Sequence, residues 1–575
     1  MKRFSMWRYP ARWPLFRVDD RLLLIFTGAI VGILSGLAAV ALNRSLSFMF
    51  DYLHRFRGHF LAFLLPAGGA ALSSIFLNQI IREKPGHGVP EVIYSVSRYG
   101  GLLRFRSSFS RLISSCLTIG SGGSAGPEAP VVMSGSAIGS NIATLFSLND
   151  KQRVTLVGCG AAGAISSIFN APIAGMIFTM EIILGEWSTV NIVPIAIAAV
   201  VGTEVSHFFT GDQIAFSHRN FSIHPLDVIS CVGLAVLTAL ASIILTRMLR
   251  RMHGVVAKVS LPFWLKAAVG GCAVGLLGLY FPDILGEGYH SITEMIGGIF
   301  EAGILAAALG AILKIVATSL TLGWGGSGGI FAPCLVIGSF VGLFFQRGLT
   351  VMFPYVDWVN EGCYALLGMA GLISGILQAP LTGIFLIVEI TGSYEVMLPL
   401  IVVSAFSTTI SRYFEPASFY LKDLVERGQL LRPGTDSRVL SDLSIAELLE
   451  TDCICVKKDM LLRDFLNIVQ KSRRNYFPVE DEKTGHFIGM VHLDDIRPYL
   501  FNRVMYDTVL IEQIMNGKMM TADISDELPA VLSTMDENGF FSMPVVSEKR
   551  FVGMISKATL LDQYRKELMV QTSDT

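Results

Sequence analysis

The stretch "GSGGSAGPEAPVVMSGSAIG", residues 120–139, places a single carboxylate, Glu128, among glycine, alanine, serine and two prolines. Proline is favoured in the first turn of a helix, because the N–H that it lacks would have no intrahelical partner there. The stretch therefore predicts a glycine-rich loop that leads into a helix starting near Glu128. Such a helix start exposes unpaired N–H groups and carries about half a positive charge, which makes it an anion site.

A second stretch, "GWGGSGGIFAPCLVIGSFVG", begins at Gly323 and aligns with the first without a gap. A further pair follows each of them: "GAAGAISSIFNAPIAGMIFTMEI", ending at Ile182, aligns with "GMAGLISGILQAPLTGIFLIVEI", ending at Ile390. This part of the chain is therefore a duplication. Repeats with broken segments in corresponding places indicate a binding site between two halves of a membrane protein.

The composition indicates a protein embedded in a lipid bilayer. Of the 575 residues, 52% are hydrophobic and only 16% are charged, and the mean hydropathy is +0.56. Apolar runs broken by Gly, Pro and Ser extend from about residue 22 to about 410, and charged residues return from about 421. Many runs are too short for a full span of about 20 residues, so we expect broken helices.

Charge and cysteine content exclude several function classes. The net charge of -1 provides no basic field for nucleic acid. The eight cysteines have no metal-ligand spacing, so we expect no metal site. Since no nucleophile and base are paired either, we do not expect an enzyme.

The basic residues of the chain predict which of its segments lie on the cytoplasmic side of the membrane. The opening "MKRFSMWRYPARWPLFRVDD" is basic and has no cleavage site, so we interpret residues 1–21 as a retained cytoplasmic tail. By the positive-inside tendency, two basic loops are expected on the same side. They are Arg98, Arg104, Arg106 and Arg111, and Arg247, Arg250 and Arg251.

The C-terminal tail contains its own duplication. "RRNYFPVEDEKTGHFIGMVHLDDI" and "NGFFSMPVVSEKRFVGMISKATLL" each indicate a strand, a turn, a second strand and a helix. We therefore predict a soluble α/β module over 436–568, after a membrane domain over 22–428 whose two repeats occupy roughly 22–215 and 225–420.

Glu128 is expected to compete with an anion. A site made of partial charges rather than Lys or Arg binds an ion weakly enough to release it, as conduction requires. The Glu128 carboxylate would take the place of the ion and open the path when it is protonated or displaced. The alternative is an acidic residue that only stabilises a helix N-terminus.

These residues carry a resemblance to the CLC chloride channel and transporter family followed by a tandem CBS-domain module. It extends from about residue 22 to about 565. The motifs occur in the family's order: "GHGVPEV" at 86–92, "GPEAP" at 126–130, "FNAPIAG" at 169–175, "GGIFAP" at 328–333 and "SFYLKDLVERG" around Tyr420.

The resemblance implies a mostly α fold of tilted and broken helices in an inverted internal repeat, with a small cytoplasmic α/β CBS pair. It implies chloride as the transported ion, no required cofactor, and a homodimer with one pore per subunit in a bacterial inner (plasma) membrane. Glu128 occupies the position of the family's gating glutamate. The anion site implied comprises His87, Gly88, Gly126, Ala129, Ile330, Phe331 and Tyr420.

Three positions of the anion site depart from the family pattern. Pro127 stands where many relatives have a basic residue, and Ala129 where they have glycine. Proline removes one N–H donor from the outer anion site. His87 replaces a serine whose hydroxyl touches the ion, and it would either donate an N–H to chloride or cap a helix and face water.

A further departure concerns protons. Proton-exchanging relatives commonly have an inner glutamate directly after the position of Glu181, where this chain has Ile182. We therefore expect passive, channel-like conduction. The alternative is a chloride/proton antiporter that uses Glu128 with Glu181 or Glu186, although both of the latter also suit packing or capping. A sensor or divalent-cation transporter is disfavoured, because one repeat has Phe331 in place of the acid.

The CBS module contains half of a nucleotide-binding signature in each copy. The family pattern has a Ser or Thr and an Asp soon after the second strand. The first copy has His492 and Asp495, and the second has Ser556 and Thr559. Binding of an adenine nucleotide and a ligand-free regulatory or dimerisation role both remain open.

Overall fold

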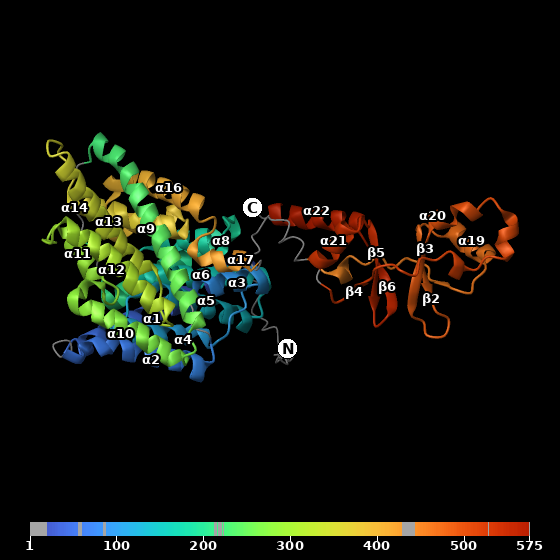
Figure 1. Ribbon diagram of the computed structural model, residues 1–575, viewed down its shortest axis with the longest axis horizontal. Coiled ribbons are helices and arrows are strands. Elements are labelled where there is room, and N and C mark those ends of the chain that lie inside the picture. The colour runs from blue at the N-terminus through green and yellow to red at the C-terminus, as the bar shows by residue number, and fades with distance from the viewer. Residues whose placement is uncertain are drawn as a thin grey trace. The chain divides into compact units, whose positions relative to one another are not determined.

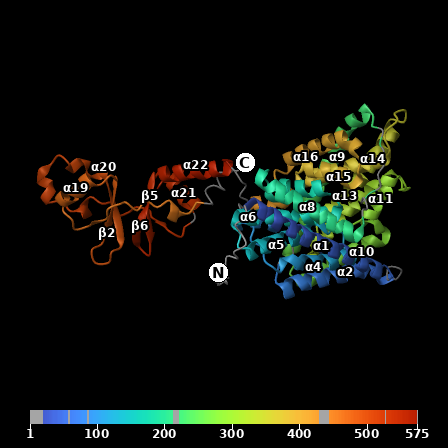
Figure 2. The same ribbon diagram turned by 180° about the vertical axis from the view of Figure 1, so that it is seen from behind.

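The computed structural model describes residues 20–55, 60–83, 88–211, 216, 221, 223–427, 443–526 and 528–573. The chain divides into two compact units, Met1–Leu430 and Leu431–Thr575. We call them the helical unit and the C-terminal unit; Figures 1 and 2 show their elements from opposite sides.

The first half of the helical unit contains eight described α-helices and two π-helical segments. They are α1 (Asp20–His54), α2 (Leu65–Ile75), η2 (Phe76–Ile81), α3 (Val89–Tyr99), α4 (Ser107–Gly120), α5 (Glu128–Leu145), α6 (Asp150–Phe169), α7 (Pro172–Phe178), η3 (Thr179–Leu184) and α8 (Thr189–Thr210).

The second half repeats this order and adds a short last helix. Its helices are α9 (Pro225–Lys258), α10 (Phe263–Tyr280), α11 (Tyr289–Gly297), α12 (Ile304–Gly323), α13 (Phe331–Met352), α14 (Glu361–Leu377), α15 (Pro380–Thr391), α16 (Met397–Phe414) and α17 (Phe419–Glu426). The helices α5 and α13 start at Glu128 and Phe331, which are aligned positions of the repeat.

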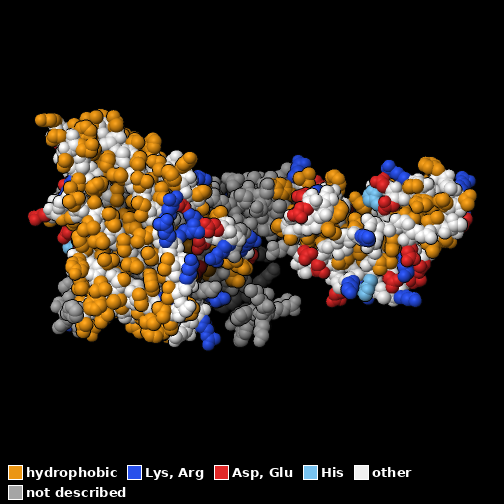
Figure 3. Space-filling view, in the orientation of Figure 1, with side chains coloured by type: hydrophobic (Ala, Val, Ile, Leu, Met, Phe, Trp, Pro, Cys, Tyr) orange, Lys and Arg blue, Asp and Glu red, His pale blue; other side chains and the backbone are white. Residues whose placement is uncertain are grey.

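The helical unit has the surface and the helix lengths of a membrane protein. Among the described residues, eight helical segments are long and apolar enough to cross a bilayer. Hydrophobic side chains cover most of its visible face in Figure 3. Several other helices are shorter than a span, including α7, α14 and α15, so the predicted broken helices are present.

The two repeats of the sequence also pack their helices in the same way. In the first half α1, α6 and α8 pack against one another, and α5 packs on α6; Figure 2 shows α1 and α8 side by side. In the second half the corresponding helices α9, α14 and α16 pack in the same way, with α13 on α14. Each half therefore has the same internal arrangement.

The two halves meet through the backbone of the repeated glycine motif. Gly126 N–H donates to the Gly329 carbonyl at 2.8 Å, and Gly329 N–H donates to the Gly126 carbonyl at 2.7 Å, in an antiparallel bridge. A Cβ built at Gly126 would lie 3.0 Å from Ala332 N, and one built at Gly329 would lie 3.1 Å from Ala129 N. Glycine is required at both positions because two helix starts approach each other there.

Each half also caps a helix of the other. The Glu181 carboxylate accepts hydrogen bonds from the backbone N–H groups of Leu381 (3.2 Å) and Thr382 (2.8 Å), in the first turn of α15. Its repeat counterpart, Glu389, accepts from Ile173 (3.0 Å) and Ala174 (2.7 Å), in the first turn of α7. Both helices begin with proline after alanine and lack a side-chain cap of their own, so these carboxylates satisfy N–H groups that would otherwise be unpaired.

One local difference between the halves has a clear cause in the sequence. The segment "EIILG" (181–185) is one residue longer than its counterpart "EITG" (389–392). The first forms the end of the π-helical segment η3, whereas α15 stays α-helical to Thr391. A single inserted residue in a helix is commonly accommodated as a π-bulge.

The prediction of two basic loops is wrong for most of their residues. Arg104 and Arg106 lie in a loop, but Arg98 lies in α3, and Arg247, Arg250 and Arg251 lie in α9.

Arg111 is not a loop residue either. It lies within α4, is 2% exposed, and donates through Nη2 to both oxygens of Glu91 on α3, at 2.9 and 3.0 Å. A buried arginine needs such a partner. It therefore holds α3 on α4 and carries no information about which side of a membrane the loop faces.

The C-terminal unit has two copies of one small α/β motif. The first contains β1 (Val456–Lys457), α19 (Leu462–Lys471), β2 (Tyr476–Glu480), β3 (Phe487–His492) and α20 (Leu493–Ile496); the second contains β4 (Ala522–Asp523), α21 (Leu528–Glu537), β5 (Ser542–Ser547), β6 (Arg550–Ser556) and α22 (Lys557–Ser573). In each sheet the first strand is parallel to the central one and the third is antiparallel to it.

The segment that precedes each copy packs into the hydrophobic core of the other copy. Leu443, Ile445 and Leu448, which precede the first copy, belong to the hydrophobic core of the second. Ile511, which precedes the second copy, belongs to the core of the first. Backbone bridges accompany both exchanges, Glu450 with Met554 and Met490 with Asn516.

The reciprocal caps generate a stability prediction. Replacing Glu389 by Gln leaves one amide oxygen for two N–H groups and removes the favourable charge at the start of α7, which we expect to cost about 1–2 kcal/mol. The thermal unfolding midpoint of the purified protein in detergent should fall. Glu301→Gln, at an exposed position in the loop before α12, is the matched control and should leave the midpoint unchanged; equal midpoints for the two variants would contradict the capping role.

Candidate functional site

Glu128 lies at the point where the two halves meet. It is the first residue of α5 and is 1% exposed. Its Oε1 accepts a hydrogen bond of 2.6 Å from the Tyr289 hydroxyl. Its Oε2 has no hydrogen-bond partner among the residues that the structure describes. A buried carboxylate oxygen without a donor is costly, so its position needs an explanation from its surroundings.

Those surroundings are the start of α13. A Cβ built at Gly126 would overlap Glu128 Oε2 and would lie 3.0 Å from Ala332 N, so the carboxylate and the first turn of α13 border the same glycine. The backbone N–H groups of Ala332 and of Glu128 itself lie close to the carboxylate. The carboxylate thus lies where a helix terminus favours negative charge.

The aromatic and apolar residues beside this point are fully enclosed. Phe331 is 2% exposed, and its ring lies 5.5 Å from Phe169 and 6.1 Å from Phe178. Ile330 is buried and directly precedes α13. The Phe331 side chain thus packs in the protein interior, while the backbone of the first turn of α13 lies close to Glu128.

Tyr420, at the start of α17, belongs to the same neighbourhood. It is 1% exposed, and its electrostatic neighbours are Cys334 in the first turn of α13 and Glu128. The helix α17 packs against α3 and α14. Tyr420 therefore lies within electrostatic range of Glu128 and of the first turn of α13.

The start of α3 approaches the site from the side of Ala129. Gly88 precedes α3 with φ 82°, and a Cβ built on it would lie 3.1 Å from the Ala129 carbonyl oxygen and 3.0 Å from Met133 Cβ. Only glycine fits this close approach. His87 lies outside the described residues. Pro127 precedes α5 and contributes no N–H.

The residues of the predicted proton route differ in their burial and in their hydrogen bonds. Ile182 is buried, whereas Glu181 is engaged by α15 through the two backbone hydrogen bonds above and a third, of 2.7 Å, from the Thr382 hydroxyl. Glu186 lies half-buried in the loop before α8, where Asn191 Nδ2 donates to it at 3.3 Å.

Three residues near Glu128 were not expected from the sequence: Glu287, Tyr289 and Lys314. We call them the α11 cluster. A signal for them exists, because "GEGYHSI" (286–292) aligns with "GHGVPEV" (86–92) as a further repeat pair, and Lys314 aligns with the buried Arg111 in the gapless alignment of the glycine motifs. The weak similarity of "YHSI" to "VPEV" hides the pair.

Comparison with known proteins identifies the helical unit. Residues 68–412, more than half of the chain, match the family model described as voltage gated chloride channel. The chain belongs to the voltage gated chloride channel (CLC) family. It is an integral membrane protein.

Individual relatives agree with this. The chain is 32% identical over 344 residues to a ClcB-like chloride channel protein of Ralstonia nicotianae, covering 59% of this chain and 79% of the relative. It is 28% identical over 423 residues to the H(+)/Cl(-) exchange transporter ClcA of Salmonella schwarzengrund, covering 69% and 87%.

Solved structures show the same fold. A slow cyanobacterial Cl-/H+ antiporter matches with a TM-score of 0.65 and 22% identity, over 72% of this chain and 99% of that one. A eukaryotic CLC transporter matches with a TM-score of 0.62 and 16% identity, over 94% and 99%. The expected mostly α fold with an inverted repeat and a small α/β pair is confirmed.

The C-terminal unit contains two CBS domains, matched over residues 445–502 and 511–566. In the first, Asp495 Oδ2 accepts from the backbone N–H of His492 at 2.9 Å and caps the short helix α20. In the second, the hydroxyls of Ser556 and Thr559 both donate to Glu450 Oε1, that of Ser556 at 2.5 Å. The two hydroxyls of the signature are therefore used by a carboxylate of the chain itself.

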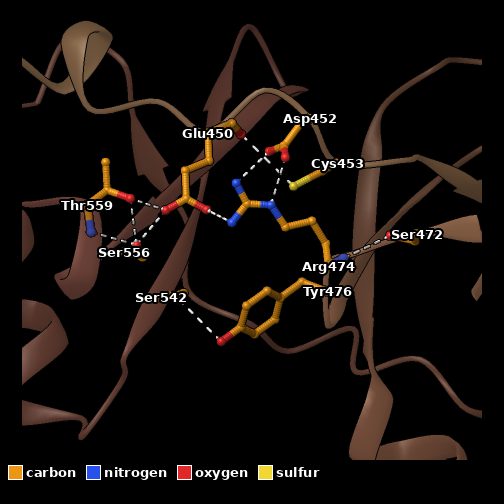
Figure 4. A network of polar contacts seen from close by, with 9 residues as sticks. All are labelled: Glu450, Asp452, Cys453, Ser472, Arg474, Tyr476, Ser542, Ser556 and Thr559. Carbon is orange, nitrogen blue, oxygen red and sulfur yellow. Dashed lines mark hydrogen bonds and ion pairs between the residues drawn. The ribbon is translucent and has the colours of Figure 1, made fainter.

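Glu450 also joins the two CBS domains, as Figure 4 shows. Its Oε2 accepts a hydrogen bond of 2.5 Å from Nη1 of Arg474, which lies just before β2 of the first domain. Arg474 Nε donates to Asp452 Oδ2 at 2.9 Å, and this bond lowers the pKa of Asp452 and raises that of Arg474.

Among the described residues, no group of three or more His, Cys, Asp or Glu side chains is arranged to hold a metal ion.

The Glu450 contacts generate a prediction. Glu450→Ala removes the acceptor of two hydroxyls and one partner of Arg474, at a side chain only 12% exposed, so local opening should become easier by about 1–3 kcal/mol. Hydrogen exchange of the full chain should show faster exchange at the amides of residues 450 and 554, which pair with each other. Glu482→Ala removes an exposed ion pair with Lys457 and should leave both amides unchanged; the same exchange rates in both variants would contradict a role of Glu450 in joining the domains.

Proposed function

We propose that this protein transports chloride across a membrane along a path in which Glu128 competes with the ion. The observation that carries the proposal is the Gly126–Gly329 backbone pairing, which brings the starts of α5 and α13 together with the Glu128 carboxylate at the start of α13. Helix N-termini bind anions without a cationic side chain. A chloride ion would take the place of this carboxylate.

The remaining anion-site residues have roles consistent with this proposal. Gly88, Gly126 and Ala129 would let the backbone approach the ion, Ile330 and Phe331 would contribute backbone N–H groups and a dry wall, and the Tyr420 hydroxyl would line the central position. Partial charges of this kind hold an anion weakly enough for passage.

We propose passive conduction as the mode of transport. By the family resemblance, Ile182 stands where exchanging relatives have an inner glutamate. Its side chain is buried and cannot carry a proton. Glu181 accepts three hydrogen bonds at the start of α15 and has a structural function there.

A chloride/proton antiporter is the second candidate. It is favoured by the descriptions of two similar proteins, the Salmonella ClcA exchange transporter and the cyanobacterial antiporter. In that case Glu186, half-buried beside α8, would be the inner proton acceptor in place of residue 182.

We further propose a homodimer with one path per subunit, in a bacterial inner membrane with both termini in the cytoplasm. The cytoplasmic assignment rests on basic residues at the end of α9, where Arg247 pairs with Glu415 and Arg250 with Glu426 of α17, the helix that leads out of the helical unit. For the CBS module we propose a regulatory or dimerisation role without bound adenine nucleotide, because Glu450 already uses the hydroxyls of Ser556 and Thr559.

The central test is Glu128→Gln. An amide cannot carry the negative charge that competes with chloride, so the variant should conduct at pH 7.5 about as fast as the parent does at pH 4.5, and its efflux should depend little on pH. Chloride efflux from proteoliposomes measures both. Glu301→Gln, at an exposed position, should retain the parental pH dependence. A Glu128→Gln variant that conducts no faster than the parent would refute the assignment of the gate.

Simultaneous recording of chloride and proton flux separates the two modes. For passive conduction, a chloride gradient across sealed vesicles should move no protons uphill, and the reversal potential should equal the chloride potential. Uphill proton movement would establish the antiporter instead, and Glu186→Gln should then abolish the proton flux.

A further inference from the structure

The start of α11 contacts Glu128 directly. Tyr289 is the first residue of α11, after Gly288 with φ 86°. Its hydroxyl donates to Glu128 Oε1 at 2.6 Å, and its ring packs on Phe216 with centroids 6.3 Å apart. A hydrogen bond to an ionised carboxylate is among the stronger kinds, and this one lies in a buried site.

Lys314 holds the segment that leads into α11. It is fully buried on α12, and its Nζ donates to the carbonyl oxygens of Ile284 and Gly286, each at 3.0 Å. A Cβ built at Gly288 would lie 3.1 Å from Lys314 Nζ, so the ammonium group also reaches the residue before Tyr289. The Lys314 side chain thus fixes the position from which Tyr289 reaches Glu128.

Glu287 completes the α11 cluster. Its charge interacts with Glu128 and with Lys314. An ammonium group at Lys314 would lower the cost of placing the half-buried Glu287 carboxylate near that of Glu128. Among the residues that the structure describes, the ionisable groups close enough to interact electrostatically with Glu128 are Glu287 before α11, Tyr289 on α11, Cys334 on α13 and Tyr420 on α17.

We propose that Tyr289 is a positioning residue for Glu128. Its hydroxyl holds the Glu128 carboxylate at the start of α13 and so sets how strongly that carboxylate competes with the transported anion. The inference rests on the proposed function, because it assigns a partner to the residue that gates the path.

The physical argument compares two states of Glu128. When the carboxylate is ionised and in place, Tyr289 donates to a full negative charge. When Glu128 is protonated, the hydroxyl can donate only to a neutral carboxyl, which is a weaker acceptor than a carboxylate. When chloride displaces the Glu128 side chain, the hydroxyl loses this acceptor. The hydrogen bond therefore favours the blocked state, and hydrogen bonds to charged groups are strong enough to shift such an equilibrium by about tenfold or more.

The test is Tyr289→Phe in the full-length protein, reconstituted in liposomes. Without the hydroxyl, Glu128 should be protonated more readily and displaced more easily. We expect half-maximal chloride efflux about one pH unit higher than in the parent, and the chloride concentration for half-maximal flux to fall about tenfold. An unchanged pH profile together with an unchanged chloride dependence would overturn the proposal.

Tyr364→Phe is the matched control. Tyr364 is a buried tyrosine on α14, and its hydroxyl donates to Asp227 on α9 at 3.2 Å. The substitution removes the same atom and the same kind of hydrogen bond elsewhere in the helical unit. It should leave the pH midpoint and the chloride dependence as in the parent; a shift equal to that of Tyr289→Phe would show a general packing effect and would overturn the proposal.

A double variant shows whether Tyr289 acts through Glu128. In the Glu128→Gln background, Tyr289→Phe should change neither the pH profile nor the chloride dependence, because the charged acceptor is already absent. A shift that persists there would overturn the positioning role. The proposed function and the role of Tyr289 can fail separately. If Glu128→Gln alone leaves the pH dependence of chloride efflux intact, the assignment of Glu128 as the gate is wrong. If Glu128→Gln changes the pH dependence but Tyr289→Phe does not, only the role of Tyr289 is wrong.

Discussion

The helical unit depends on the close contact between two helix starts at Gly126 and Gly329. The paired backbone hydrogen bonds of 2.8 and 2.7 Å form only because neither residue has a side chain. They fix the start of α5 against the start of α13, and with them the place of the Glu128 carboxylate. The same relation between the halves recurs at Glu181 and Glu389, each of which caps a helix of the other half. The site and the scaffold therefore follow from one approximate two-fold relation.

Much of this arrangement could be predicted from the sequence. Gapless alignment of the glycine motifs, together with proline in the first turn, placed the starts of α5 and α13, because these signals are local and depend on backbone chemistry. The broken helices and the two small sheets of the CBS pair were also predictable from apolar run length and strand alternation. The family resemblance then implied which side chains would line the anion site.

The contacts between distant segments could not be predicted in the same way. Tyr289 and Glu128 are far apart in the chain, and nothing in "GEGYHSI" shows that its tyrosine reaches a carboxylate on another helix. The sequence predicts Arg111 to be a loop cation, because its buried pair with Glu91 depends on the packing of α3 against α4. Glu450 has no motif around it, yet it accepts hydrogen bonds from the second CBS domain and from Arg474 of the first. Each of these depends on tertiary packing that brings one polar group to another.

The exchange of leading segments in the C-terminal unit has a mechanical consequence. The polypeptide that comes from the helical unit enters the core of the second CBS domain before it builds the first, since Leu443, Ile445 and Leu448 pack there. A change in the position of residues 443–448 would therefore act first on the domain that comes later in the sequence. Neither domain has a complete interior when cut from the other, so the pair is the smallest part of this unit that can respond as a whole.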